Sequence, residues 1–318
     1  MSRIKILGLL LMMISIKSFG QTDEEILKDL KDSEDKSSFR VGVGIGNKVF
    51  STHNNTLNAQ QTANTIIFTP SIGYYHKSGL SLSATGYLLN SNGNSGFLQY
   101  AINPAYDYTN DAISLSLSYT HYFTTNAYNT SLTPVQNDFF GSLTSKKGWL
   151  RPGIQIGYAS GEFKEIVHVD TTVKSGNTLT HYNFIDTSTT KQNSFSFTPT
   201  LEHSFASKGV FTDNDYFNFI PRLMVNFGSG SQQVVRTTSG NFSSLVNHTR
   251  GRKRNFREKS QGSYTSKFTL QSLGLDLEGD YNIGKLDIEP NLYIDYYLPK
   301  TQGKRITTVF SINFSYSF

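Results

Sequence analysis

Histidine and serine are the residues of this chain that could carry out nucleophilic hydrolysis, which needs a serine, a general base beside it and a third group that orients the base. His168 could act as that base beside Ser160 or Asp170, whereas His121 and His203 fall on the apolar phase of alternating segments. No Gly-x-Ser-x-Gly stretch occurs and the chain contains no cysteine. His, Asp and Glu do not recur at the spacings of metal ligands. We therefore expect no catalytic residue, no metal, no cofactor and no enzymatic activity; a hydrolase of lipid or peptide is the least favoured alternative.

Charged residues recur on the polar phase of the alternating segments in the second half of the chain. The nine candidates are Arg151, Glu202, Arg222, Asp276, Glu278, Asp287, Glu289, Asp295 and Arg305. The turn at 279–285 should bring Asp276 and Glu278 opposite Asp287 and Glu289, which predicts an acidic patch. In a water-filled passage, this patch and the three arginines would select small hydrophilic solutes. In a narrow interior the same charges would pair across the space and close it, so both alternatives stay open.

A basic run stands out at 248–259, "HTRGRKRNFREK", with six basic residues and one acid. Its candidate binding residues are Arg250, Arg252, Lys253, Arg254 and Arg257. Such a run can bind phosphates, or it can be a solvated external loop. Nucleic acid binding is not expected, because Phe256 is the one aromatic ring available for stacking against bases.

An alternation of apolar and polar residues begins at residue 38 and continues to the end of the chain, which predicts an all-β protein. Twelve strands are predicted at 39–45, 66–74, 80–88, 98–108, 113–123, 150–158, 163–169, 195–205, 217–227, 264–279, 286–298 and 304–318. Two further segments, 178–187 and 231–239, would raise the count to fourteen. Short turns such as "HKSG", "TND", "ASGE" and "YNIGK" separate longer connections at 51–63, 124–147, 174–192 and 228–263.

The two faces of these strands differ in a way that favours lipid over a second packed sheet. The polar face is small and rich in hydroxyl groups, as in Ser114, Ser116, Ser118 and Thr120, while aromatic residues concentrate near strand ends. In hydrocarbon every backbone N–H and C=O group must be paired, so such a sheet has to close into a barrel. We therefore predict a closed antiparallel transmembrane β-barrel with short periplasmic turns and longer external loops.

The chain ends in a row of alternating apolar residues, Phe310, Ile312, Phe314, Tyr316 and Phe318. This ending resembles the C-terminal signature of Gram-negative outer-membrane β-barrels, and the resemblance extends over residues 38–318. It implies export through the periplasm, residence in the outer membrane among lipid and lipopolysaccharide, and insertion by the barrel-assembly machinery. By the same resemblance, Phe314, Tyr316 and Phe318 are the assembly signal.

The first 37 residues precede the alternating pattern. Arg3 and Lys5, the apolar run from Ile6 to Ile16, and the small residues Ser18 and Gly20 predict a secretory signal peptide at 1–20. Residues 21–37 form a charged periplasmic lead-in that can hold a short helix. The formal net charge of +5 falls to +2 once the signal peptide's three basic residues are removed, so the pI near 9.1 is weak support for an anionic partner.

These features predict a porin-like channel for small hydrophilic solutes as the leading function. The alternative is a non-conducting structural or accessory barrel that acts as a partner in a larger outer-membrane complex. The width of the free lumen decides between the two predictions. A barrel of twelve strands is intermediate in diameter between eight-stranded barrels, which are filled with side chains, and open sixteen-stranded porins.

Overall fold

The structure is a computed structural model that describes residues 37–47, 66–91, 94–124, 135–175, 178–213, 215–246, 249–250, 254–299 and 305–318. Its strands are β1 (Ser38–Gly46), β2 (Ile67–Tyr75), β3 (Leu80–Ser91), β4 (Asn94–Thr109), β5 (Ile113–Thr124), β6 (Asn137–Ser145), β7 (Arg151–Ser175), β8 (Thr178–Glu202), β9 (Phe205–Lys208), β10 (Asp215–Val246), β11 (Thr249–Arg250), β12 (Arg254–Ile283), β13 (Leu286–Tyr297) and β14 (Ile306–Ser317). The predicted signal peptide, and the lead-in up to residue 36, lie outside the described residues and stay predictions.

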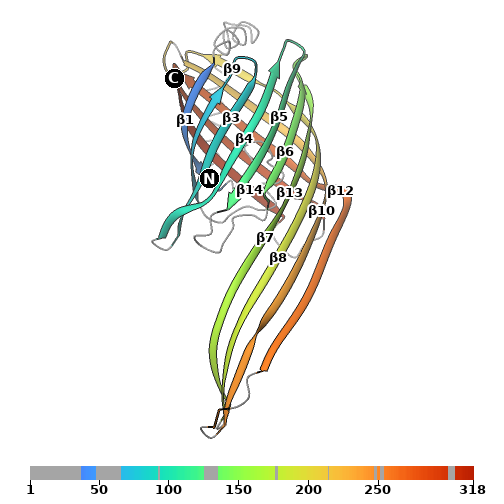
Figure 1. Cartoon of the computed structure of the whole chain (residues 1–318). Helices are drawn as coiled ribbons and strands as arrows, with labels where there is room; N and C mark the ends of the chain where they lie inside the picture. The colour runs from blue at the N-terminus through green and yellow to red at the C-terminus, as the bar shows by residue number, and fades with distance from the viewer. Residues whose placement is uncertain are drawn as a thin grey trace, which may run out of the picture.

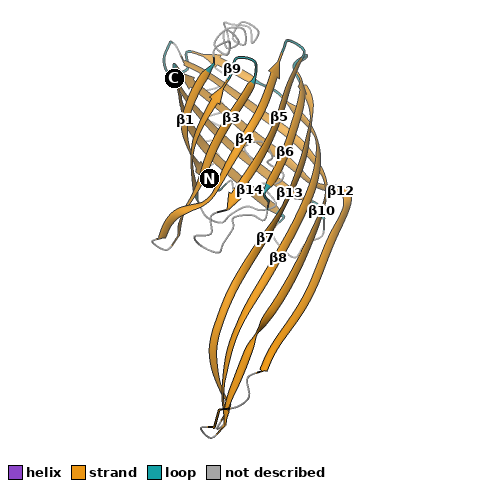
Figure 2. Cartoon of the chain, viewed as in Figure 1, coloured by secondary structure: helices purple, strands orange, loops and turns teal. Residues whose placement is uncertain are grey.

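Twelve of these strands close into one antiparallel ring (Figures 1 and 2). The ring runs from β1 to β8, continues through β10, β12, β13 and β14, and returns to β1. The two short strands β9 and β11 each pair with β10 beside this path. The predicted all-β barrel of twelve strands is therefore confirmed. The two segments that would have made fourteen, 178–187 and 231–239, are parts of β8 and β10.

The ring closes where β1 pairs with β14, so the start of β1 and the end of β14 lie side by side. The Phe318 N–H donates to the Phe39 carbonyl oxygen over 2.9 Å. We call the end that carries these residues the turn end, because the connections at 76–79, 110–112 and 284–285 lie there too. The opposite end is called the blade end, after the extension described below.

Gly46 allows the close approach of β1 to β14 at the seam. A Cβ atom at this position would collide with the Phe310 carbonyl oxygen and would lie 2.8 Å from the Cα of Ser311. The Asn47 side chain ties the same place, because its Oδ1 accepts from the Phe310 N–H over 2.8 Å and its Nδ2 donates to the Thr308 carbonyl over 3.0 Å. The seam is thus packed backbone against backbone, and only glycine fits.

Gly46→Ala is expected to lower the free energy of unfolding by about 1–3 kcal/mol, the usual cost of overpacking a closed interface. Urea unfolding in lipid vesicles measures this change. Gly262→Ala is the matched control, because a Cβ at Gly262 in β12 meets nothing within 4 Å. That control should be neutral or slightly stabilising, since alanine restricts the unfolded chain. Equal unfolding midpoints for the two variants would contradict the account of the seam.

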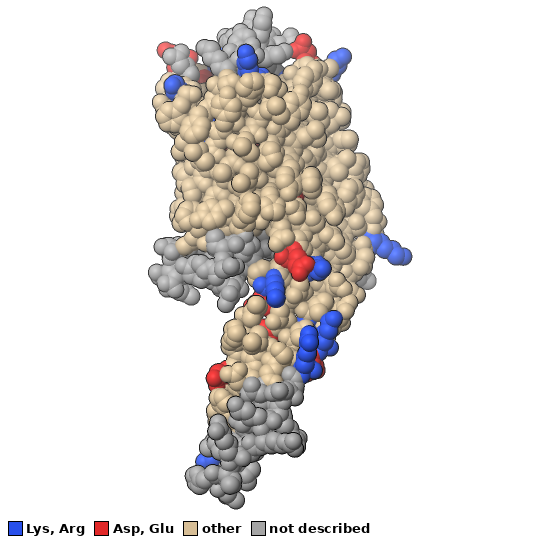
Figure 3. All heavy atoms as spheres, in the orientation of Figure 1, with Lys and Arg blue, Asp and Glu red and all other residues tan. Residues whose placement is uncertain are grey.

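The outward face of the ring is an apolar band. On β14, the outward residues are Phe310, Ile312, Phe314 and Tyr316, each between 37% and 44% exposed, and Phe318 follows at 66%. In Figure 3 the charged side chains of the face shown gather at the two ends of the barrel and on the extension, and the band between them is nearly free of charge. A closed ring with such a band is an outer-membrane type β-barrel, as the sequence predicts. Among the described residues, no helix has the length and apolar character required to cross a bilayer.

Four neighbouring strands run far beyond the ring at the end opposite Phe39 and Phe318 (Figure 1). Strands β7 and β8 have 25 residues each, β10 has 32 and β12 has 30, whereas about 9–11 tilted residues cross a bilayer. We call this four-stranded sheet the blade: residues 161–175, 178–192, 231–246 and 254–265. At about 3.3 Å per residue, its strands extend roughly 50 Å past the ring.

The blade corrects several sequence-based boundaries. The connections predicted at 174–192 and 228–263 are mostly strand, and the predicted "ASGE" turn lies inside β7. The segments predicted as separate strands at 150–158 and 163–169 are the same strand. Conversely, β6 lies inside the predicted connection at 124–147. Along the blade the alternation weakens because both faces meet water, so the sequence there does not separate a lipid face from a polar one.

Candidate functional site

A continuous belt of buried side chains lines the inside of the barrel. Every strand of the ring contributes to this inner belt, which consists of Gly46, Ile67, Tyr87, Gln99, Ala101, Tyr122, Asp138, Ala159, Thr198, Asn226, Ser272, Tyr293 and Val309. Many neighbours in the belt are direct cross-strand partners, as in Gly46–Ile67, Ala101–Tyr122 and Tyr293–Val309, so the belt forms one level. Inward side chains of a wide aqueous pore stay wet. Burial around the whole circumference means that the lumen is filled at this level.

One side of the belt is a connected polar network centred on Asn226. The Asn226 Oδ1 accepts from Thr198 Oγ1 over 3.0 Å, and its Nδ2 lies 2.9 Å from Ser272 Oγ, 2.8 Å from the Tyr293 hydroxyl and 3.2 Å from Asp295 Oδ1. The Tyr293 hydroxyl donates to the same Asp295 oxygen over 2.8 Å. This network ties β8, β10, β12 and β13 together. Because its buried polar atoms are paired with one another, this side of the belt is stable.

The other side of the belt is aromatic and less well satisfied. The rings of Tyr87 and Tyr122 lie 6.3 Å apart in a tilted arrangement. Gln99 is fully buried beside them, and neither atom of its amide has a hydrogen-bond partner in the described part of the chain. An unsatisfied buried polar group costs about 1–3 kcal/mol. The belt is therefore weaker on this side than around Asn226.

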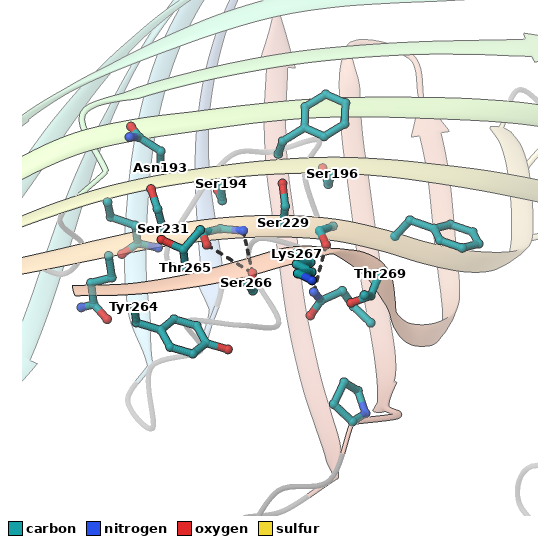
Figure 4. Close-up of a pocket in the computed structure, with 18 of the residues that line it drawn as sticks. Asn193, Ser194, Ser196, Ser229, Ser231, Tyr264, Thr265, Ser266, Lys267 and Thr269 are labelled. Carbon is teal, nitrogen blue, oxygen red and sulfur yellow. Dashed lines mark hydrogen bonds between the residues drawn. The ribbon is translucent and has the colours of Figure 1, made fainter.

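Two cavities lie on opposite sides of the belt. The turn-end vestibule, about 310 Å³, is walled by β1–β5, β13 and β14, and belt residues Ile67, Tyr87 and Ala101 border it. The blade-end vestibule, about 710 Å³, is walled mainly by β8, β10 and β12 where they leave the ring (Figure 4). Asp295 borders this second cavity and is bonded to belt residue Asn226. The belt thus lies between two polar cavities.

On the turn-end side of the belt, three of the predicted lumen charges form a buried cluster on the barrel wall. Arg222 on β10 stands directly between Glu202 on β8 and Asp276 on β12. Its Nε donates to Glu202 Oε2 over 2.6 Å and its Nη1 to Asp276 Oδ2 over 2.8 Å, and Glu278 Oε2 lies 3.5 Å away. The side chains of Arg222, Glu202 and Asp276 are 16%, 10% and 1% exposed. These charges pair along the wall and not across the lumen, so they do not close the interior themselves.

The remaining lumen candidates occupy different places. Arg151 is the cross-strand partner of Glu202, and its Nε is buried without a hydrogen-bond partner among the described residues. Asp287 accepts from Ser315 Oγ over 3.4 Å and from the Asn282 amide. Glu289 lines the turn-end vestibule, and Asp295 belongs to the Asn226 network.

Arg305 was predicted to face the lumen, and the structure places it elsewhere. It is exposed, and its Nη1 lies 3.4 Å from the Tyr296 hydroxyl, which belongs to the outward face of β13. Arg305 stands immediately before β14, where pairing with β13 has not begun, so the strand's alternation does not fix its direction.

Two important inward residues were not among the sequence-based candidates. Arg40 lines the turn-end vestibule with its guanidinium carbon 4.4 Å from the centroid of the Tyr75 ring, a cation–π contact. Asn226 is the hub of the belt. Both fall on the polar phase of clear strands, which is the signal that marked the other candidates. Nothing in the sequence distinguishes Asn226 from its polar neighbours, because its role depends on cross-strand register.

The basic run is mostly strand, which corrects its prediction as a loop. Arg250 lies in β11, and Arg254 and Arg257 lie in β12, while Arg252 and Lys253 are outside the described residues. Arg257 is exposed and stands opposite Ser239 near the far end of the blade. Binding of phosphate by this run stays a prediction.

The blade carries a charged cluster of its own on the face continuous with the lumen wall. Arg236 donates from Nε to Asp186 Oδ2 over 2.7 Å and contacts the same oxygen through Nη2, and Thr238 Oγ1 donates to Asp186 Oδ1 over 3.0 Å. Hydrogen bonding from the Arg236 guanidinium holds the pKa of the Asp186 carboxyl below its usual value. The side chain of Arg236 is 63% exposed and that of Asp186 is 12% exposed, so water reaches this guanidinium, whereas the Arg222 side chain is 16% exposed.

The histidines considered for hydrolysis are not brought beside a serine nucleophile. His168 is exposed on the blade opposite Ile185, and Ser160 lies on the same strand about 26 Å away at 3.3 Å per residue. His121 lies on the outward face with its Nδ1 2.9 Å from Asn137 Oδ1. Among the described residues, no group of three or more His, Asp or Glu side chains could hold a metal ion.

Comparison with known proteins gives matches to solved structures alone: no protein-family model and no curated protein sequence matches the chain. A bacterial polysaccharide outer membrane secretin is 9% identical, with 90% of this chain and 99% of that chain covered and a TM-score of 0.32. The TodX deltaS2S3 mutant monoaromatic hydrocarbon channel is 11% identical, with 91% of each chain covered and a TM-score of 0.34. LpxR from Salmonella typhimurium is 7% identical, with 88% and 100% covered and a TM-score of 0.29. Likeness at this level carries no argument about function.

The expectation that this chain is not an enzyme is wrong. Outer-membrane barrels include enzymes as well as channels, so the barrel fold gives no ground for excluding catalysis.

Proposed function

We propose that this protein is a porin-like passage for small hydrophilic solutes whose lumen is closed at rest by the inner belt. The observation that carries the proposal is the pair of polar vestibules on either side of the belt. A solute entering either vestibule meets hydroxyl and amide groups, and the buried side chains of the belt and of the positions next to it lie between that solute and the other vestibule. A barrel designed to be solid would have its inward face packed along its whole length, as in eight-stranded barrels.

The belt opens on its aromatic side in this proposal. Around Asn226 the buried polar atoms are paired, so opening there breaks several hydrogen bonds. Beside Tyr87 and Tyr122, the amide of Gln99 gains hydrogen bonds when water enters. That gain offsets part of the cost of exposing the two tyrosine rings. The closed state is therefore favoured by a modest margin on this side.

The proposal places the barrel in the outer membrane with its turn end in the periplasm and its blade outside the cell. The predicted signal peptide at 1–20 would direct export, and the terminal Phe314, Tyr316 and Phe318 would be bound by the barrel-assembly machinery. An even number of ring strands supports this orientation, because the start of β1 and the end of β14 then lie on the same, periplasmic side. Lipid and lipopolysaccharide would surround the apolar band.

Uptake by proteoliposomes tests the passage directly. Vesicles containing the full chain should admit a small sugar such as arabinose slowly, and should exclude a large dextran. Planar bilayers should show brief, infrequent steps of current, because the belt is closed most of the time. Vesicles as tight to arabinose as protein-free vesicles, with no current steps at any voltage, would overturn the proposal.

A second function is favoured by a different observation, the blade. In the described part of the chain, β7 has no strand partner past Ser160 on its β6 side; the Gln136 side chain donates one bond to the Glu162 carbonyl there. On its β13 side, β12 has no strand partner before Ser272, and one bond runs from the Leu298 N–H to the Gln271 carbonyl. Two free edges on a long sheet suit a barrel that presents a platform to other outer-membrane proteins. A silent barrel that co-purifies with such proteins through the blade would support this alternative.

A further inference from the structure

The blade-end vestibule has a lining of unusual composition for a barrel mouth. Strand segments 192–196, 227–232 and 264–271 form most of its wall, and these segments are rich in Ser, Thr, Asn and Gln. Of the described residues that line it, Lys267 and Asp295 carry formal charge. Asp295 is 6% exposed and is already bonded to Asn226 and Tyr293. The vestibule therefore offers many neutral hydrogen-bonding groups and little net charge.

Irregular pairing between β10 and β12 shapes this cavity. The register of the two strands shifts at Asn226/Phe227 and again at Gly228/Gly230. Side chains replace the missing ladder bonds: Ser266 Oγ accepts from the Gly230 N–H over 2.8 Å, and Gln271 Nε2 donates to the Gly228 carbonyl over 3.0 Å (Figure 4). Bulges of this kind often re-aim side chains beside binding sites. Here they leave glycine backbone and short polar side chains facing the cavity.

An aromatic ring completes the site. Tyr264 lines the cavity from β12 and is 68% exposed, an unusual state for a tyrosine on a strand. Tyr297, on β13, lines it as well. Aromatic faces pack against the C–H faces of sugar rings, while hydroxyl and amide groups bind the sugar hydroxyls. The cavity volume of about 710 Å³ is in the usual range for small-molecule sites.

We infer that the blade-end vestibule binds neutral, polyhydroxylated ligands, namely short oligosaccharides without formal charge. This inference rests on the proposed passage, because it names the class of solute that gathers at the outer side of the belt. The hydroxyl-rich lining provides binding, Tyr264 provides a stacking face, and the scarcity of charge disfavours acidic and basic sugars.

Calorimetry on the full chain in detergent tests the inference. The probes are four neutral tetrasaccharides, two of glucose with α or β linkage, one of mannose and one of N-acetylglucosamine, together with a charged tetragalacturonate. At least one neutral tetramer should bind, and the galacturonate should bind about tenfold more weakly or not at all. Failure of all four neutral tetramers to bind, or tighter binding of the acidic one, would overturn the inference.

Matched variants locate the binding. Tyr264→Ala should weaken binding of the neutral tetramer about tenfold, whereas Tyr182→Ala, a tyrosine near the blade's far end, should leave it within about twofold. Equal binding in wild type and Tyr264→Ala would remove the vestibule as the site. Because the Tyr264 side chain is exposed, we expect its substitution to leave the stability of the fold nearly unchanged.

The experiments distinguish failure of the proposed binding site from failure of the proposed passage. Vesicles that stay tight to sugars while the neutral tetramer binds to wild type and not to Tyr264→Ala would refute the passage and leave the binding site standing. Vesicles that admit arabinose while no neutral tetramer binds would refute the binding site and leave the passage standing.

Discussion

Replacing Arg222 by methionine should lower the free energy of unfolding by about 3–5 kcal/mol, because it leaves buried carboxylates without their counter-charge. Glu202 and Asp276 flank Arg222 from both neighbouring strands, at 2.6 and 2.8 Å, and their side chains are 10% and 1% exposed. Without the guanidinium, the two carboxylates repel each other in a wall with little access to water. Urea unfolding in lipid vesicles measures the loss.

The same strand provides the control. Arg236 lies fourteen positions further along β10 and pairs with Asp186, but its side chain is 63% exposed. Arg236→Met should therefore cost about 0–1 kcal/mol, as exposed ion pairs do. Similar losses in the two variants would mean that burial of the Arg222 cluster is not what makes it matter.

Neutralising the three buried groups together tests whether the loss comes from charge or from packing. In the triple variant Arg222→Met/Glu202→Gln/Asp276→Asn, neither buried carboxylate keeps its charge, and Glu278, whose side chain is 45% exposed, stays in contact with water. Most of the stability lost in Arg222→Met should return, because replacing a buried ionic cluster by neutral groups is often nearly neutral. A triple variant as unstable as the single one would show that the guanidinium acts through its packing and not its charge.

The architecture was predictable because lipid imposes the same alternation on every crossing segment. The polar phase of β8, β10 and β12 correctly put Glu202, Arg222 and Asp276 on the inward face. Their pairing was not predictable, since it depends on which inward residues stand opposite one another, and register is set by turns and bulges that a single sequence does not reveal. The sequence therefore predicts the members of the cluster and not their partners.

The predicted number of ring strands is right although two individual assignments are wrong. In β6, the outward positions between Asn137 and Ser145 hold two large apolar residues, Phe139 and Leu143, with Gly141 between them, so the segment resembles a polar connection. In β7, the apolar phase changes beyond Gly161, where the strand leaves lipid and enters the blade, and one strand is read as two. These errors compensate in the count. Both arise where the lipid-facing signal is short or absent.

The inner belt was beyond prediction for a related reason. Tyr87, Tyr122 and Tyr293 stand on the inward phase, as many polar residues do, and tyrosines elsewhere in the chain face lipid at strand ends. Whether inward rings meet at one level depends on the stagger of twelve strands around the barrel. A closed lumen is thus a property of register and not of composition.

Removing the aromatic side of the belt should convert a nearly silent barrel into a conducting one. In the double variant Tyr87→Ala/Tyr122→Ala, two buried rings leave the level where Gln99 already lacks hydrogen-bond partners among the described residues. The space left behind is polar on one side, so water enters it instead of leaving it empty. Frequent, long-lived current steps in planar bilayers are the expected result, with faster uptake of arabinose by vesicles.

Two tyrosines on the outward face give the matched control. Tyr74 and Tyr108 are 49% and 43% exposed, so Tyr74→Ala/Tyr108→Ala removes the same number of rings without changing the lumen. This control should conduct as rarely as wild type. If the belt variant were as silent as the control while both remained folded, the two vestibules would not communicate through the aromatic side. The barrel would then be better explained as the anchor of its blade, because no route for solute through its weakest level would exist.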